Sequence, residues 1–394
     1  MMEQPPLAPD DVTELARQAR TAGRLGIDTE FMGEGRYRTL LCVVQIAVPV
    51  ADGLRVEVID ALDERLDPGP LAEVLTDPAV EVVLHSGRQD VALLRRVWHS
   101  EIRGVFDTQV AAGFAGLRAQ AGYESLLREV LDVRLPKTAS YTRWDRRPLT
   151  AEQLRYARED VLHLLDAARA LRATLERRGR LEWALEECRA LESASDERDP
   201  DTLFARLPRV AGLDPGVRAV ARELVAWREE VARAQDRPAS TVLNDSALVE
   251  VARRRPRSPG DLEQVRGVSP GALRRRGDDL LEAVERGRKR PPIPGNGARR
   301  APPADADAPL IALSESLIRT RALEVGVAYE LLAARAELEE VVVSRRTHAP
   351  EPDVRALRGW RRGLVGAELL ELLDGRQALR VGPDLRVLVE RLGD

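Results

Sequence analysis

The chain has 394 residues, which is long enough for two or three domains that each bury a core of their own. Hydrophobic residues make up 44% of the chain without any run near the length of a bilayer span, so we expect a soluble protein with no membrane partner. The net charge of −4 argues against a general polyanion binder, and two distant cysteines outside any C-x-x-C motif argue against a zinc module or a disulfide framework. Residues 1–11 are polar and rich in proline, unlike an export signal, so we expect a cytoplasmic protein.

The first predicted elements are a short helix and three strands. The helix begins within residues 10–16 and ends near Gly23. Three segments rich in Val, Ile and Leu follow it, at residues 25–31, 40–48 and 55–60. The turns between them are short and polar, which predicts an antiparallel meander.

Two acidic residues share one face of the first strand. Asp28 and Glu30 are two positions apart, so their side chains point to the same side, opposite the apolar residues that alternate with them. Two carboxylates beside an apolar core need cations to compensate their charge, and carboxylate oxygens favour Mg²⁺ or Mn²⁺ over zinc. The alternative at this point is an edge strand with a solvated face.

A third acidic residue follows the next predicted strand. After a helix at residues 70–75 and a strand at 80–84, Ser86 and Gln89 have the spacing of a capping box. Asp90 lies in the first turn of the helix that would follow, near the carboxyl end of a strand, where α/β folds usually place their sites. A short strand at residues 105–108 and a helix at 124–131 come next.

A long amphipathic helix is predicted over residues 150–172. Thr150 and Gln153 again have capping-box spacing, and apolar residues recur with a helical period. Tyr156 and Asp160 are four residues apart, so both lie on one face of the helix as a phenol–carboxylate pair. The alternative is a core-edge tyrosine beside a solvated aspartate.

Taken together, these blocks resemble the ribonuclease D branch of the DEDD 3′-5′ exonucleases. The matching segments, in chain order, are Asp28-Thr29-Glu30-Phe31, His85-Ser86-Gly87-Arg88-Gln89-Asp90 and Tyr156-Ala157-Arg158-Glu159-Asp160. Lys137 and the segment Trp144-Asp145-Arg146-Arg147-Pro148-Leu149 also resemble the stretch before the third block. One departure is Gly33, where the family usually carries an arginine; Arg36 and Arg38 lie further on.

The resemblance implies a ribonuclease H-like α/β exonuclease domain, a mixed sheet with flanking helices, over residues 1–195. It implies two Mg²⁺ or Mn²⁺ ions, held by Asp28, Glu30, Asp90 and Asp160. Tyr156 would orient the attacking water, and Lys137 would contact a phosphate.

The rest of the chain predicts two small all-α domains. Residues 205–290 resemble an HRDC domain, a helical nucleic-acid-binding module, and residues 310–394 resemble the C-terminal HRDC-like domain of ribonuclease D. Residues 291–309, dense in Pro, Ala, Gly and Asp, are expected to form a linker. Arginines are clustered in the first of these domains, which indicates a phosphate-facing surface: Arg253, Arg254, Arg255, Arg274, Arg275 and Arg276. The alternative is a solvated face.

We therefore expect a metal-dependent 3′-5′ exoribonuclease, a monomer that releases nucleoside 5′-monophosphates from RNA with a free 3′ end. By resemblance, its substrates would be tRNA precursors and other small structured RNAs. Two alternatives stay open at this stage. One is a DNA-directed 3′-5′ exonuclease of repair, since recognition of the 2′-OH is not visible in a sequence. The other is a non-catalytic RNA-binding protein that keeps only the fold.

Overall fold

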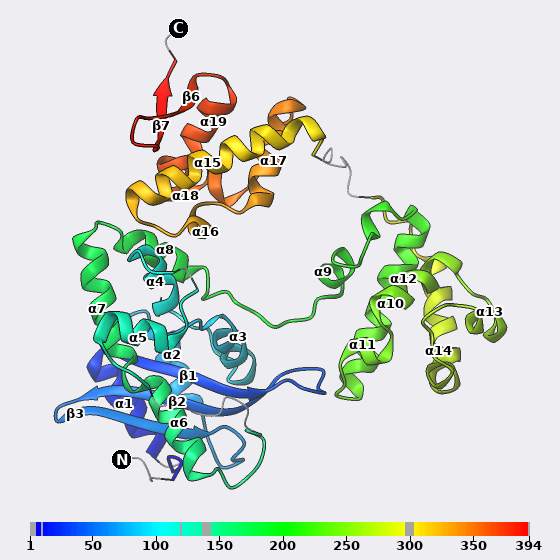
Figure 1. Ribbon diagram of the computed structural model, residues 1–394. Helices are drawn as coiled ribbons and strands as arrows, with labels where there is room; N and C mark the ends of the chain where they lie inside the picture. The colour runs from blue at the N-terminus through cyan, green and yellow to red at the C-terminus, as the bar shows by residue number, and fades with distance from the viewer. Residues whose placement is uncertain (1–4, 9–10, 119, 136–142, 296–302, 393–394) are drawn as a thin grey trace. The chain divides into compact units, whose positions relative to one another are not determined.

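The computed structural model describes residues 5–8, 11–118, 120–135, 143–295 and 303–392. The chain divides into two compact units (Figure 1). The first contains residues 1–30, 42–195 and 300–394, and the second contains residues 31–41 and 196–299. Within the described ranges, no helix is both long enough and apolar enough to cross a membrane.

A five-stranded mixed sheet forms the centre of the first unit. Its strands are β1 (Arg24–Met32), β2 (Leu40–Val50), β3 (Gly53–Asp60), β4 (Glu81–Leu84) and β5 (Val105–Asp107), in the order β3-β2-β1-β4-β5. Strands β2 and β3 pair antiparallel, as the meander predicts, whereas β1 pairs parallel with β4 and β4 pairs parallel with β5. The parallel half needs helical crossovers between its strands, and these helices cover the sheet.

Eight helices surround this sheet in the described part of residues 11–195: α1 (Val12–Ala22), α2 (Gly69–Thr76), α3 (Arg88–Val97), α4 (Thr108–Phe114), α5 (Tyr123–Leu131), α6 (Ala151–Leu162), α7 (Leu164–Arg177) and α8 (Leu181–Arg189). Helix α1 packs on α2, and α6 packs on β3 (Figure 1). Leu164 and Leu165 lie 3.4 and 3.6 Å from where a Cβ on Gly26 would be. The start of α7 therefore covers the sheet face that carries Gly26 and, two residues on, Asp28.

Two helix predictions are corrected by the structure. The single helix expected over residues 150–172 ends at Leu162 and restarts at Leu164 as α7, although its capping box at Thr150 and Gln153 is confirmed. The capping box expected at Ser86 and Gln89 is wrong, because α3 begins at Arg88 and has no side-chain cap. Ser86 has a positive φ of 59°, and its backbone N–H donates to the Asp107 carboxylate. The tertiary contact with Asp107 thus replaces the local cap.

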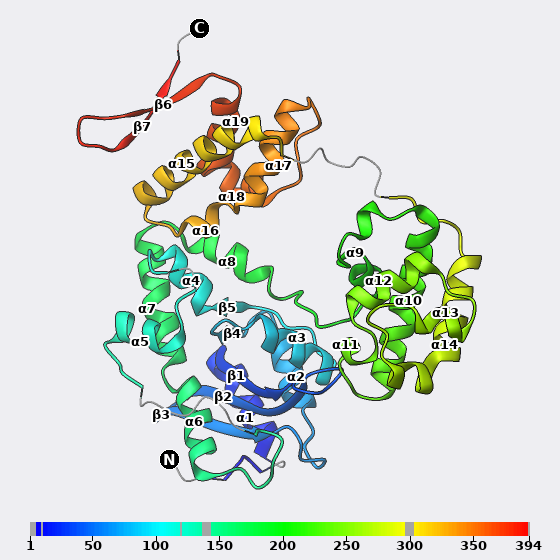
Figure 2. The ribbon, with the colours of Figure 1, turned by 45° about the vertical axis from the view of Figure 1, so that its right-hand side comes forward.

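The C-terminal part of the first unit is mostly helical. Its elements are η3 (Asp305–Asp307), α15 (Ala308–Val325), α16 (Tyr329–Leu332), α17 (Arg335–Arg346), η4 (Arg355–Leu357), α18 (Gly359–Arg361), a π-helical turn η5 (Arg362–Gly366), α19 (Ala367–Leu373), β6 (Gln377–Val381) and β7 (Val387–Arg391). The antiparallel hairpin β6–β7, visible beyond α19 in Figure 2, corrects the expectation of helix alone in this region.

This C-terminal part packs on α8. The indole rings of Trp360 and Trp183 stack with centroids 5.0 Å apart, and Trp360 also meets Phe114 edge-on at 5.1 Å. The Arg361 guanidinium, almost fully buried, donates to both carboxylate oxygens of Glu187 at 2.6 and 2.7 Å. Such a bidentate pair fixes geometry as well as charge.

The second unit is helical. Its elements are α9 (Pro200–Ala205), η2 (Val210–Gly212), α10 (Pro215–Ala234), α11 (Ala239–Val242), α12 (Asp245–Arg254), α13 (Pro259–Glu263) and α14 (Pro270–Lys289). Helix α10 packs against both α12 and α14 around a core that includes Val220, Leu224 and Leu248. Proline occupies the first position of α10, where its missing N–H costs no helical hydrogen bond.

The two helical regions share one succession of elements. In each, a long helix is followed by a four-residue helix, two extended residues and a helix of 10 or 12 residues: α10-α11-α12 in one and α15-α16-α17 in the other. The first extended residues, Leu243 and Ala333, have nearly equal φ values of −158° and −155°. The matched spacing indicates an internal structural repeat.

Candidate metal centre and active site

The acidic residues predicted from three separate segments converge at the sheet. Strand β1 supplies Asp28 and Glu30, and the last turns of α6 supply Asp160. One carboxylate oxygen from each of these three residues lies within 4.8 Å of the others. A set of hard oxygen donors at this separation suits a divalent cation such as Mg²⁺ or Mn²⁺.

Asp90 is held at the edge of this cluster. It lies in the first turn of α3, is 7% exposed, and accepts a hydrogen bond from the Thr29 hydroxyl. It is outside the three-residue group, yet its charge raises the pKa of both Asp28 and Glu30. Asp90 therefore lies within the electrostatic field of the other carboxylates.

The raised pKa values of the four carboxyl groups show that ionising all of them without a cation would be unfavourable. Burial raises the pKa of Glu30 to about 8, of Asp160 to about 7 and of Asp90 to about 6, and neighbouring carboxylates add to each shift. The pKa of Asp28 is raised well above its usual range, first by burial and then by Asp90, Asp160 and Glu30. Among the described residues, no Lys or Arg forms an ion pair with any of the four. The donor set therefore fits a cation that would supply the missing positive charge.

Tyr156 lies on α6 one turn before Asp160, as predicted. Burial raises the pKa of its phenol above the ordinary value, and the charges of Asp160, Glu30 and Asp28 raise it further. The hydroxyl therefore stays protonated at neutral pH and can donate a hydrogen bond. The Tyr156 ring packs against Trp144, with centroids 6.0 Å apart.

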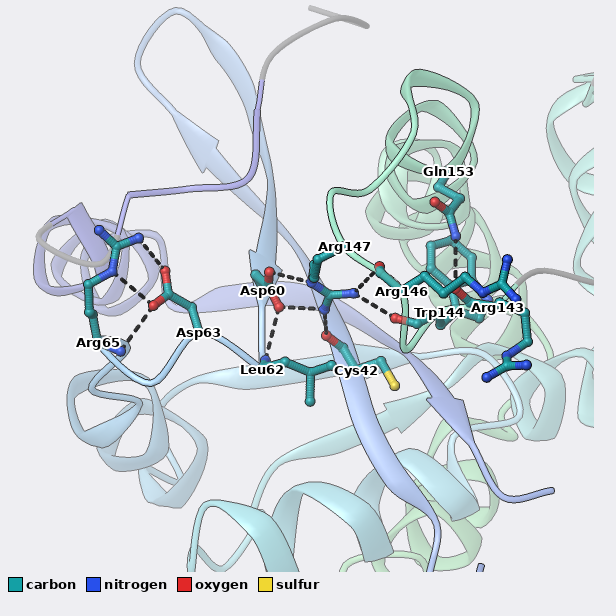
Figure 3. Close-up of polar contacts among 10 residues, drawn as sticks. All are labelled: Cys42, Asp60, Leu62, Asp63, Arg65, Arg143, Trp144, Arg146, Arg147 and Gln153. Atoms are coloured by element: carbon teal, nitrogen blue, oxygen red, sulfur yellow. Dashed lines mark hydrogen bonds and ion pairs between the residues drawn. The ribbon is translucent and has the colours of Figure 1, made fainter. Parts of the chain in front are cut away.

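The sequence pattern did not predict how this tyrosine is anchored. Figure 3 shows Arg147, just before α6, reaching back to the sheet: its guanidinium pairs with Asp60 and donates to the backbone oxygen of Cys42 at 2.9 Å. The same side chain donates to the Trp144 carbonyl at 2.7 Å. Arg147 thus ties the segment that carries Trp144 to strands β2 and β3.

A second tyrosine near the cluster was also missed. The pKa of Tyr123, on α5, is raised first by burial and then by Asp160 and Asp28, which places its phenol within the field of the cluster. Its ring lies 5.3 Å from that of His85, whose Nδ1 hydrogen-bonds the Thr108 hydroxyl at 2.9 Å. Only the Gly-Tyr pair that opens α5 would have hinted at this residue in the sequence.

Four of the six predicted arginines of the second unit line one of two surface pockets. Arg275 and Arg276 line a pocket of about 740 Å³ together with Arg237. Burial lowers the pKa of Arg276, and the charges of Arg275 and Arg237 lower it further, whereas Asp279, which also lines the pocket, raises it. Three cations around one hollow favour an anionic ligand.

The second pocket, of about 380 Å³, is lined by Arg254, Arg255, Arg257 and Arg288. Arg254 also pairs with Glu250 at 2.6 Å. Arg253 and Arg274 are exposed outside both pockets. Lys137, the predicted phosphate contact, lies outside the described residues.

Comparisons with known proteins agree with this fold. Residues 4–176 match a family model described as 3′-5′ exonuclease, and residues 217–284 match the HRDC domain model. A mixed sheet with two acidic residues on β1, joined by one acidic residue from each of α3 and α6 and followed by an HRDC domain, defines a 3′-5′ exonuclease of the DEDD class.

Sequence identity to individual relatives identifies the family within this class. The chain is 35% identical to ribonuclease D of Gluconacetobacter diazotrophicus over 94% of this chain and 93% of that protein, and 37% identical to ribonuclease D of Granulibacter bethesdensis with the same coverage. The crystal structure of Escherichia coli RNase D, described as an exoribonuclease involved in structured RNA processing, superposes with a TM-score of 0.82. That match has 28% identity and covers 95% of this chain and 99% of that one. The chain belongs to the ribonuclease D family and is a 3′-5′ exoribonuclease.

Proposed function

We propose that this exoribonuclease uses two Mg²⁺ or Mn²⁺ ions, held by Asp28, Glu30, Asp90 and Asp160, to release nucleoside 5′-monophosphates from RNA 3′ ends. The convergence of the four carboxylates without a compensating cation among the described residues carries this proposal. Bound ions would supply Lewis acidity to the attacking and leaving oxygens of an in-line displacement at phosphorus. Asp28 is the residue best suited to contact both ions, because all three other carboxylates act on its pKa.

The protein's own side chains would do the positioning. Tyr156, protonated because its pKa is raised, would donate its O–H to the attacking water and fix the direction of its lone pair. Trp144 packs against this tyrosine, and Arg147 ties the Trp144 segment to the sheet through the contacts in Figure 3. Glu30 would lie near the water and the terminal sugar.

The proposed substrates are tRNA precursors and other small structured RNAs, and the proposed working form is a monomer. Support comes from the E. coli relative, whose described role is in structured RNA processing. The arginines that line the two pockets of the second unit would hold phosphates of such an RNA while its 3′ end is trimmed.

The domain boundaries are proposals as well: exonuclease 1–195, HRDC 205–290, linker 291–309 and HRDC-like 310–394. The model match over 217–284 supports the second of these. The repeated succession of helices in α10–α12 and α15–α17 supports an HRDC-like origin for the C-terminal part.

The test uses one sequence made as RNA and as DNA, each labelled at its 5′ end, with Mg²⁺. The expected result is stepwise shortening of the RNA from its 3′ end, release of nucleoside 5′-monophosphates, and much slower degradation of the DNA. A tRNA precursor with a 3′ extension should be trimmed close to its mature end. Equal or faster loss of DNA would favour the repair exonuclease, and nucleoside 3′-monophosphates would contradict the mechanism.

A further inference from the structure

Gln45, in the middle of β2, is a buried amide without a partner. Its side chain is fully buried, and neither Oε1 nor Nε2 has a hydrogen-bond partner among the described residues. Buried side-chain amides are nearly always hydrogen-bonded, so an unpaired amide of this kind calls for a partner from a nearby side chain or from a water.

The register of the sheet places this amide beside the metal centre. Strand β2 lies next to β1, and a Cβ built on Gly26 would be 3.6 Å from the Cβ of Ala47. Gly26 is near the start of β1 and Ala47 near the end of β2, so the two strands run antiparallel. Two residues along each strand, Asp28 and Gln45 face each other on the same side, with a Cβ separation of about 4.5–5.5 Å expected for such a pair.

The other strand neighbours of Gln45 on this face offer it nothing polar. Across β3 it pairs with Val58, and along β2 it is flanked by Val43 and Ala47, all three fully buried. Of these four neighbours, the Asp28 carboxylate is the one group that can accept a hydrogen bond from the amide.

We propose that Gln45 is a positioning residue of the metal centre, whose Nε2 donates to a carboxylate oxygen of Asp28 when that carboxylate holds its cation. The bond would fix the rotation of the carboxylate, so that its other oxygen faces the cation. Groups that orient a metal ligand in this way commonly change metal affinity when they are removed. This inference rests on the proposed metal site.

The test compares the full-length wild type with Gln45→Met, which keeps the shape of the side chain and removes its amide. Mn²⁺ binding is measured by calorimetry, and thermal melting is measured with and without Mn²⁺. The expected result is Mn²⁺ affinity weaker by about 10-fold and a smaller Mn²⁺-induced rise in Tm. The Tm of the metal-free variant should be equal or higher, since an unpaired buried amide is gone.

Gln377→Met is the matched control. Gln377 is also a buried strand glutamine, but it lies in the C-terminal hairpin, where its Nε2 donates to Glu371. This change should lower the Tm and leave the Mn²⁺ affinity unchanged, because it breaks a structural bond away from the acidic cluster.

The outcomes separate this inference from the proposed metal site. If wild type binds Mn²⁺ and Gln45→Met binds it equally well, Gln45 has only a packing role and the inference is overturned. If the wild type itself binds no Mn²⁺, the proposed metal site is contradicted, and the role of Gln45 with it. Should Gln45→Met not fold, a crystal structure of the Mn²⁺-loaded wild type decides: Nε2 within about 3.2 Å of an Asp28 oxygen supports the inference, and a water as its partner overturns it.

Discussion

At the scale of single residues, the acidic cluster combines side chains whose local surroundings differ. Asp28 and Glu30 lie on the same side of one strand because side chains alternate along it. Asp160 lies on a helix that begins after the Thr150 cap. Asp90 is oriented by the hydroxyl of Thr29, the residue between the two strand carboxylates. Strand β1 therefore both supplies two candidate ligands and holds a third.

Asp28→Asn should abolish cleavage without unfolding the protein. The change keeps the size of the side chain and removes one negative charge from the cluster. We therefore expect the metal ions to stabilise the transition state less by several kcal/mol, which corresponds to a kcat lower by about 1,000-fold. The Tm without metal should be equal or higher, because one repelling carboxylate is gone. Turnover with Mg²⁺ and melting curves are the two measurements; a folded variant with normal turnover would rule out Asp28 as a ligand.

Tyr156→Phe should lower kcat by about 10- to 100-fold and leave RNA binding unchanged. Only the hydroxyl is lost, and a hydrogen bond made to the attacking water contributes in the chemical step and not in binding. Single-turnover rates at saturating enzyme give kcat, and filter binding gives the affinity. An unchanged single-turnover rate would show that Tyr156 serves only to pack against Trp144.

The residues whose roles were not predicted from the sequence have partners that are distant along the chain. Arg147 and Asp60 are 87 positions apart, and Gln45 faces Asp28 only because β1 and β2 pair in one register. The segment that contains Arg147 resembles the family's stretch before the third block, but nothing in it indicates a partner 87 positions away, and a glutamine in an apolar strand is common. The acidic residues were predictable because their spacing and flanking residues carry the signal within each segment.

At the scale of elements, strong local signals were reliable and weak ones were overridden. The Thr150 capping box predicted the start of α6, but the break at His163 has no Gly or Pro to mark it. The hairpin β6–β7 did have a local signal, because Gly382-Pro383-Asp384 separates two segments rich in Val and Leu. Because the whole region resembles a helical domain, only helices were predicted there.

Arg147→Met should loosen the segment that precedes α6. It removes the pair with Asp60 and the bonds to the Cys42 and Trp144 carbonyls, so we expect a loss of about 1–3 kcal/mol in the free energy of unfolding and a lower kcat through misplacement of Tyr156. Urea unfolding and single-turnover rates measure the two effects.

Arg65→Met is the control for this prediction. Arg65 forms its pair with Asp63 two residues away, in the same part of the protein, but its side chain is 79% exposed. An exposed pair of this kind contributes little, so stability and kcat should both stay near wild type. Equal losses in the two variants would mean that Arg147 has no special role.

At the scale of the whole molecule, the raised carboxylate pKa values predict an unusual pH dependence of stability. Without metal, the folded protein binds more protons than the unfolded chain between the ordinary carboxyl range near pH 4 and about pH 8, where Glu30 titrates. Stability should therefore fall as pH rises through this window. Saturating Mg²⁺ binds the ionised carboxylates and should remove the decline. Urea unfolding from pH 5 to 8.5, with EDTA or Mg²⁺, measures this; a metal-free protein whose stability rises over the window would contradict it.

The arginine pocket of the second unit should make RNA binding sensitive to salt. In the full chain, changing Arg237, Arg275 and Arg276 together to Gln removes the three cations that face that pocket. Removing one cation that binds a phosphate of single-stranded RNA lowers the magnitude of the slope of log affinity against log salt by about 0.7. For three cations, we expect the magnitude of the slope to decrease by up to about 2 and the affinity to weaken. The rate on a short unstructured RNA at saturation should not change.

The control for this surface changes three exposed arginines of the first unit, Arg17, Arg65 and Arg103, which already pair with neighbouring acids. This variant has the same net charge as the pocket variant. Equal salt slopes in the two variants would show that RNA binding depends on total charge and not on the pocket.

The most direct test of the central claim is to count the ions in the acidic cluster. Calorimetric titration of Mn²⁺ into the full chain, bound to an RNA whose 3′-terminal linkage resists hydrolysis, should give two ions per chain for wild type and fewer for Asp28→Asn. Absence of binding in wild type, or the same stoichiometry and affinity in both proteins, would contradict a metal centre built on these carboxylates.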